Sequence, residues 1–193
     1  MKFAHSAVAA ALGLACAGAA FAQAGTVQRD VNQQQRIEQG LQSGQLNTRE
    51  AARLEREEAR VERDQARGMQ DGKLSPAEKA RLAREQNRVS RDIYREKHDA
   101  QTGNPSSASS QRMQADVQRN INQQQRIEHG VQSGSLTTRE TAKLERGEAR
   151  IDRKEARAGG DGKVNAREQR RIQKAENRES RRIHREKHDA QTQ

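Results

Sequence analysis

Two segments of this sequence have the residue types of a calcium-binding loop. DGKLSPAE (71–78) and DGKVNARE (161–168) match the second half of an EF-hand loop, with its glycine, aliphatic residue and final glutamate. The first half of such a loop must supply several oxygen ligands, yet its positions 1, 3 and 5 hold Arg67, Met69 and Asp71. We therefore interpret both segments as a turn followed by a helix cap, and we predict no cofactor.

A pair of histidines has the spacing of a transition-metal site. His184 and His188 stand four residues apart, which places both on one face of a helix, where they could bind zinc, copper or nickel. No third histidine or cysteine lies near them, and the matching residues 90 positions earlier are Tyr94 and His98. We expect two solvated histidines near the end of a helix, where a cation complements the helix dipole. Periplasmic metal binding through this pair is the alternative hypothesis.

A dense run of cations lies near the C-terminus. It consists of Arg167, Arg170, Arg171, Lys174, Arg178, Arg181, Arg182 and Arg185. Glu168, Glu176 and Glu179 oppose these cations on the same predicted helix. Because almost no aromatic residue is present to stack on bases, nucleic acid could be bound only through its phosphates and without sequence specificity. We predict that this surface contacts an anionic envelope component or an acidic partner protein.

Catalytic constellations are difficult to assemble from this sequence. Nucleophilic catalysis needs Ser, Cys or Thr beside an oriented base, and the serines lie mostly in the leader, the turns and the linker. Acidic residues are abundant, but Arg or Lys follows or precedes them at helical spacing. We interpret these carboxylates as solvated charged faces, and we predict that the protein is not an enzyme.

The candidate residues are carried by a duplicated unit. Residues 27–102 and 117–192 align without a gap at an offset of 90, and 46 of the 76 aligned positions are identical. Between the two copies lies GNPSSASSQRMQAD (103–116), whose glycine, proline and serines predict a flexible linker. Two domains of one kind are therefore expected.

Each copy predicts three helices and no strand. Capping boxes at Asn47–Glu50 and Ser75–Glu78 predict helices over 48–67 and 76–98, joined as an antiparallel hairpin. A shorter helix precedes this hairpin, with Val27, Val31, Ile37 and Leu41 on one arc. Bulky apolar residues make up only 11 of the 76 residues in the first copy, so we expect an all-α protein with a thin core and marginal stability.

The two copies differ in how their charges are balanced. In the first copy, acidic and basic residues alternate along both hairpin helices at spacings of three and four. Four of the acidic residues, Glu57, Asp64, Glu85 and Asp92, become Gly147, Lys154, Ala175 and Arg182 in the second copy. The first copy has 16 basic and 14 acidic residues, for a net charge of +2. The second has 19 and 12, for a net charge of +7.

The N-terminus predicts export. Lys2 precedes an apolar run over 7–20, and Ala20-Phe21-Ala22 supplies the small residues that a signal peptidase recognises, so residues 1–22 are interpreted as a signal peptide. Lipoprotein anchoring at Cys16 is disfavoured because the expected leucine three residues earlier is absent. The apolar run is also short and rich in Ala and Gly for a membrane span, so no transmembrane segment is expected in the mature chain. The predicted location is the periplasm.

Three segments carry a resemblance to known proteins. RIEQGLQSGQLNTREAARLE, DGKLSPAEKARL and SRDIYREKHD resemble small exported helical proteins of Gram-negative bacteria that have no assigned function. The resemblance covers both copies and implies a periplasmic location. It supplies no catalytic or binding residues.

Overall fold

The structure, a computed structural model, describes residues 12–189, with side chains from Gln23 onward. Within this range the chain is all-α, as predicted, and has no strand. Its α-helices are α1 (Leu12–Ser43), α2 (Thr48–Gly68), α3 (Pro76–Lys97), α4 (Ala108–Gln132), α5 (Thr138–Ala158) and α6 (Ala166–Glu186), and a short 3₁₀ helix, η1 (Gly159–Asp161), follows α5.

Capping boxes begin four of these helices. In α2, the Asn47 side chain accepts hydrogen bonds from the backbone N–H groups of Arg49 and Glu50, and Glu50 Oε2 accepts from Asn47 N at 2.9 Å. Equivalent boxes begin α3, α5 and α6. Each box satisfies donors that the first helical turn would otherwise leave unpaired. The predicted starts of the hairpin helices are therefore confirmed.

The two EF-hand-like segments use their acidic residues within turns and caps. Gly72 has φ of +93° and Gly162 has φ of +91°, so each glycine adopts the left-handed conformation that turns the chain. The aspartate before each glycine accepts a hydrogen bond from the backbone N–H two residues later, at 3.1 Å and 2.9 Å. The final glutamates, Glu78 and Glu168, close the capping boxes of α3 and α6. The predicted turn and cap are confirmed.

Two boundaries differ from the prediction. The first helix is longer than expected, because α1 begins at Leu12 and thus includes part of the predicted leader, of which residues 1–11 lie outside the described range. The predicted linker 103–116 is shorter, because Ser107 caps α4 and accepts from Ser110 N at 3.1 Å. No helix in the described range is both long enough and apolar enough to cross a membrane.

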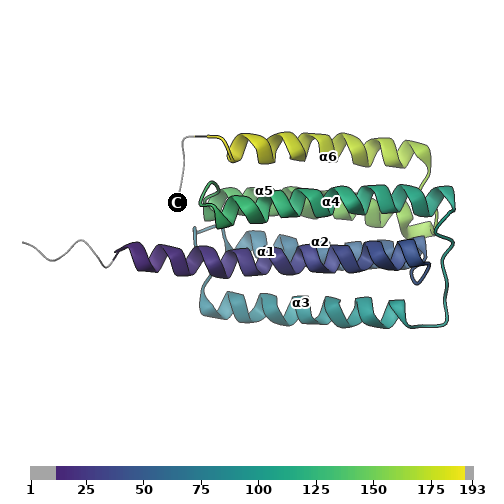
Figure 1. The fold of residues 1–193 in the computed structure, drawn as a ribbon, viewed down its shortest axis with the longest axis horizontal. Helices are drawn as coiled ribbons and strands as arrows, with labels where there is room; N and C mark the ends of the chain where they lie inside the picture. The colour runs from purple at the N-terminus through teal and green to yellow at the C-terminus, as the bar shows by residue number, and fades with distance from the viewer. Residues whose placement is uncertain (1–11, 190–193) are drawn as a thin grey trace, which may run out of the picture.

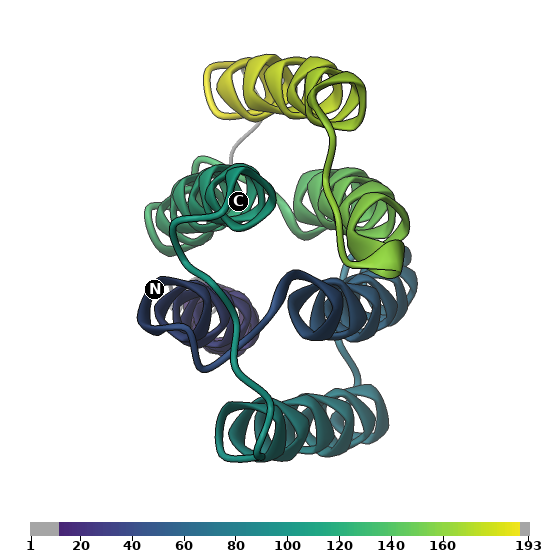
Figure 2. The ribbon, with the colours of Figure 1, turned by 90° about the vertical axis from the view of Figure 1, so that its right-hand side faces the viewer.

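The helices form four layers. Seen from one end in Figure 2, α1 and α2 lie beside each other below α4 and α5, while α3 and α6 cover the two outer faces. In Figure 1 α1 runs antiparallel to α4, its equivalent in the second copy, and α2 runs antiparallel to α5. The inner helices pack most extensively across the two copies, as the pairs α1–α4 and α2–α5. The four inner helices therefore form a bundle to which each copy contributes two.

The two copies make matching internal contacts and pack antiparallel to each other, which together indicate an approximate twofold relation. Arg36 donates hydrogen bonds to the hydroxyl and the carbonyl oxygen of Ser90 at 2.6 and 3.0 Å. Ninety residues later, Arg126 donates to the same two atoms of Ser180 at 2.7 and 3.1 Å. These bonds attach the outer helix of each copy to the first inner helix. The duplication in the sequence is thus repeated in the contacts of each three-helix set.

The two copies share a hydrophobic core. The predicted apolar arc of Val27, Val31, Ile37 and Leu41 is buried. The larger hydrophobic cluster joins residues of α1, α2 and α3 to residues of α4, α5 and α6. A chain with few bulky apolar residues thus pools them across the duplication, which increases the apolar surface removed from water.

Small residues allow α2 and α5 to approach closely. Ala52, Ala59 and Ala66 recur every seven residues on α2, and Ala142, Ala149 and Ala156 do the same on α5; all six are buried. A Cβ added to Gly159, just after α5, would lie 2.8 Å from the Cβ of Ala52. Heptad spacing keeps one face of each helix toward its partner. The alanines therefore form a seam with no room for larger side chains.

We predict that Ala149→Leu destabilises the protein by about 1–3 kcal/mol, because additional methyl groups in a close-packed seam force the helices apart. Chemical unfolding of the full chain would measure this change. The matched control is Ala80→Leu, at an exposed position of α3. Equal free energies of unfolding for the two variants would contradict the close packing of α2 on α5.

Candidate functional site

The predicted cation run lies on the outer surface of α6. Seven of its eight members are exposed, namely Arg167, Arg170, Arg171, Lys174, Arg178, Arg181 and Arg185, and we call them the basic face. The eighth, Arg182, is partly buried and donates to Glu179 at 3.0 Å. Glu176 and Glu179 are buried on the opposite side of the helix, so they do not interrupt the basic face.

The loss of acidic residues in the second copy leaves cations without ion pairs. In α3, Arg81 pairs with Asp64 and Glu85, both at 2.9 Å. The equivalent residue in α6 is Arg171, and the acidic positions around it are Lys154 and Ala175. In the described part of the chain, Arg171 forms no ion pair within 4.0 Å. The predicted difference in charge balance is therefore visible in the side-chain contacts.

The two histidines stack on each other at the end of α6. The ring centroids of His184 and His188 lie 4.3 Å apart with an angle of 17° between the planes, and both side chains are exposed. His188 Nδ1 lies 2.7 Å from the carbonyl oxygen of His184 and is thus engaged with the backbone. Because imidazole lone pairs lie in the ring plane, two nearly parallel stacked rings do not direct them at one metal ion. The arrangement lends no support to the alternative hypothesis.

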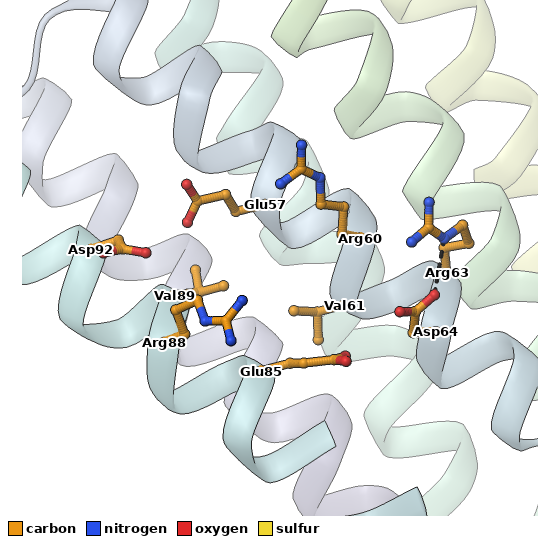
Figure 3. A pocket seen from close by; sticks show the side chains of 9 residues that line it. All are labelled: Glu57, Arg60, Val61, Arg63, Asp64, Glu85, Arg88, Val89 and Asp92. Atoms are coloured by element: carbon orange, nitrogen blue, oxygen red, sulfur yellow. Dashed lines mark hydrogen bonds and ion pairs between the residues drawn. The ribbon is translucent and has the colours of Figure 1, made fainter. Parts of the chain in front are cut away.

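A groove lies between α2 and α3 in the first copy. Figure 3 shows its charged walls, with Glu57 and Asp92 toward one end and Asp64 toward the other, above Val61 and Val89. Its volume is about 250 Å³. Burial, followed by the neighbouring Asp92, raises the pKa of Glu57 to about 7. The other carboxylates of the groove form ion pairs with arginines. We therefore interpret the groove as part of the alternating acidic and basic residues along α2 and α3, and not as a ligand site.

The second copy fills the equivalent space. Gly147 replaces Glu57, and a Cβ at this glycine would lie 2.1 Å from the Glu179 carboxyl carbon. Glu179 itself replaces Val89 and extends across the glycine toward Arg182. The substitutions in the second copy therefore act together: one side chain is removed and another occupies its place.

The interpretation of the carboxylates as solvated faces is wrong for a large group of them. Eleven carboxylates among the described residues are at most 1% exposed; Glu140 closes a capping box and Glu176 pairs with Arg119, and we call the other nine the interior carboxylates. They are Asp30, Glu55, Glu58, Glu62, Asp116, Glu145, Glu148, Asp152 and Glu155. None forms an ion pair with Lys, Arg or His within the described residues. Their arginine neighbours along the sequence point outward instead.

Burial changes the protonation of these groups. It raises the pKa of Asp30 and Glu55 to about 7 and that of Asp116 to about 8. For Glu58 and Asp152, burial and then neighbouring carboxylates raise the pKa well above its usual range. An isolated buried charge is too costly to persist, so such groups either take up a proton or acquire a cation.

A sequence signal for the interior carboxylates was available. Along α2, Ala52, Glu55, Ala59, Glu62 and Ala66 follow one another at spacings of three and four. The glutamates therefore share a face with the alanines of the seam. The same spacing also fits alternating Glu and Arg residues on a solvent-exposed helix face, which is the interpretation that the sequence alone favours. Only the alanine partners distinguish the two possibilities.

We predict that the protein, in a buffer freed of metal ions, loses stability as pH rises. The pKa values of Asp30 and Glu55 rise on folding from 3.8 and 4.5 to about 7, so the folded state holds more protons than the unfolded state between these values. For each extra proton held, the free energy of unfolding falls by about 1.4 kcal/mol per pH unit. The stabilisation is thus complete below the pKa that each carboxyl has in the unfolded chain. It is lost as pH rises through the pKa that the carboxyl has in the folded protein.

Chemical unfolding in chelator-treated buffer between about pH 5 and pH 7 would measure this slope. Glu55→Gln should make the slope shallower, whereas Asp71→Asn, at an exposed turn, should leave it unchanged. Stability that rises across this range would show that the interior carboxylates ionise without penalty.

Neither a family model, nor a curated protein, nor a solved structure matches this chain. Two features of the described residues bear on function: the basic face on the outside and the interior carboxylates on the inside.

Proposed function

We propose that this protein is exported and binds an anionic component of the cell envelope through the basic face of α6, without catalysing a reaction. One observation carries the proposal: seven exposed cations lie on one outer helix. Its acidic residues are the cap residue Glu168, the buried Glu176 and Glu179, and Glu186, which pairs with Lys143 of α5. Such a surface attracts phosphate-bearing partners over several ångströms.

The position of α6 in the fold supports this role. The helix covers one outer face of the molecule, so its basic side is directed away from the bundle (Figure 2). Hydrogen bonds from Arg126 to Ser180 and an ion pair from Arg119 to Glu176 attach its inner side to α4. The basic face can therefore contact a flat surface without rearrangement of the fold.

The chemistry of the face favours phosphate groups at a membrane surface. Arginine presents a planar set of donors that matches phosphate oxygens. Along α6 the cations recur at spacings of one, three and four, which spreads them over a broad strip and not around a single pocket. A broad strip suits many phosphates in a plane, as in anionic phospholipid headgroups or lipid A.

Vesicle binding tests the proposal. We expect the triple variant Lys174→Gln, Arg178→Gln, Arg181→Gln to bind phosphatidylglycerol vesicles at least about tenfold more weakly than the unmodified chain, since each cation near an anionic surface contributes about 1 kcal/mol. Binding of the unmodified chain should also weaken steeply as salt is added. Cosedimentation with the vesicles, or fluorescence anisotropy of a chain that carries an attached fluorophore, would measure both effects.

The duplication supplies a matched control. Arg84→Gln, Arg88→Gln, Arg91→Gln removes the same three charges at the equivalent exposed positions of α3. We expect a clearly smaller loss of binding from this variant. Equal losses from the two triple variants would attribute binding to net charge alone and would refute a specific role for α6.

A further inference from the structure

Three interior carboxylates converge on one point of the bundle. The oxygen atoms of Glu55 from α2 and of Asp152 and Glu155 from α5 lie within 4.8 Å of one another, and all three side chains are fully buried. Three formal negative charges in such a small volume repel one another strongly in a medium of low dielectric constant. The fold nevertheless brings them together from two different copies.

Amide side chains from the other two inner helices complete this cluster. Asn120 of α4 donates through Nδ2 to Asp152 at 3.2 Å and to Glu155 at 2.9 and 3.1 Å. Gln34 of α1 donates to Glu55 at 3.0 Å. We call these five residues the donor cluster. All four helices of the inner bundle contribute to it.

Several oxygens of the donor cluster have no hydrogen-bond partner. These include the amide oxygens of Asn120 and Gln34, in side chains that are 1% exposed, and one carboxylate oxygen each of Glu55 and Asp152. Buried polar atoms are nearly always paired in folded proteins. Of these atoms, the unpaired carboxylate oxygens of Glu55 and Asp152 are the kind of ligand that hard cations prefer.

Apolar layers enclose the donor cluster on both sides. Along α1, Gln34 lies between the buried residues Val27 and Ile37, and along α4, Asn120 lies between Val117 and Ile127. These apolar residues belong to the two hydrophobic clusters of the molecule. A polar layer is thus sealed within the core, and neutralising charge must come from protons or from a bound cation.

The approximate twofold relation places a companion set of donors next to this cluster. The residues equivalent to Glu55, Asp152, Glu155, Asn120 and Gln34 are Glu145, Glu62, Gln65, Asp30 and Gln124. Gln124 donates to Glu62 at 2.6 Å and to Glu145 at 3.5 Å, and Gln65 lies beside Asp30. Asp152 also lies beside Glu62, so the two sets adjoin.

The two sets have the same composition although their positions have changed. Each contains three carboxylates and two amides. In the donor cluster Glu155 is acidic and Asn120 is an amide, whereas in the companion set the equivalent Gln65 is an amide and Asp30 is acidic. Compared with the donor cluster, the companion set thus has an amide in place of one carboxylate and a carboxylate in place of one amide. The exchange keeps a hydrogen bond between one amide and one acid, and it keeps three carboxylates in each set.

We propose that the donor cluster binds a hard metal cation of the size of Ca²⁺, held by the carboxylates of Glu55, Asp152 and Glu155, which Asn120 and Gln34 orient through their amide N–H groups. This site is distinct from the basic face and goes beyond the surface binding proposed above. It also replaces the expectation of no cofactor, which rested on the exposed loops alone.

The type of cation follows from the ligands. All donors are oxygen, and no histidine or cysteine is among them, which disfavours zinc and copper. Three bidentate carboxylates can supply six oxygens, which is the lower end of the range that Ca²⁺ requires. Mg²⁺ retains several waters and demands octahedral geometry, which a sealed apolar surround does not favour. Trivalent lanthanide ions share the oxygen preference of Ca²⁺ and serve as probes.

Refolding of the full chain tests the site. The chain would be unfolded with chelator, desalted, and refolded with either calcium chloride or potassium chloride at equal ionic strength. We expect calcium to raise the Tm by about 5 °C or more, because a ligand that binds only the folded state stabilises it. Europium luminescence lifetimes in H₂O and D₂O would count the waters on the bound ion, and we expect few or none.

Neutral isosteric variants separate the site from the exposed loops. Asp152→Asn with Glu155→Gln removes two ligand charges while keeping the side-chain shapes. Without metal this variant should fold with a Tm at least as high as that of the unmodified chain, because two repelling groups are gone, and it should lose the calcium response. The control variant Asp161→Asn with Glu168→Gln changes the EF-hand-like loop and should retain the full response.

Three results would overturn the proposal. One is an unchanged Tm and no saturable europium binding, which would mean that protons alone neutralise the cluster. Another is a calcium response that persists in the Asp152→Asn, Glu155→Gln variant or disappears in the loop variant. The third is bound europium that keeps most of its coordinated water, as an exposed acidic surface would allow.

Discussion

Nine carboxylates buried within a strongly basic protein are the constraint on which the rest of the structure depends. Seven of them lie on α2 and α5, the helices that the buried alanines bring together, so the close packing of the two copies also buries these acids. Each copy alone would expose these faces. The fold therefore needs both copies, and it needs a means of neutralising its interior.

Either protons or metal cations can neutralise the interior carboxylates, but the two need different arrangements of the surrounding side chains. A protonated carboxyl needs an acceptor for its proton, and an unpaired oxygen of Glu55 or Asp152 could serve. A cation needs several oxygens arranged around a centre. Oxygens of Glu55, Asp152 and Glu155 converge in this way, which is why the cation is the stronger interpretation.

Much of the fold follows from local rules that the sequence states openly. The capping boxes at Asn47 and Ser75 mark the starts of helices, and Gly72 must adopt a left-handed turn between them. The duplication at an offset of 90 predicts two matching sets of helices. The basic face of α6 was also predictable, because it depends only on helical spacing and on the loss of acidic partners.

The packing of the two copies was not predictable in the same way. A glutamate such as Glu55, with arginines at helical spacing, has the same local pattern whether it faces solvent or the partner helix. Its environment is decided by contacts with the other copy, about one hundred residues away. The predicted linker illustrates the same limit. Its glycine, proline and serines suggest a flexible segment, although Ser107 caps α4.

The separation of charge connects the inside of the molecule to its outside. Acidic residues of α2, α5 and α6 turn inward, and the arginines between them turn outward, so one helical period distributes the two signs to opposite sides. The formal net charge of +10 counts every interior carboxylate as ionised. Each one that is neutralised by a proton or a cation makes the molecule more positive to its surroundings. A filled interior would therefore strengthen the attraction of α6 for an anionic surface, and the two properties would be linked through the charge of one bundle.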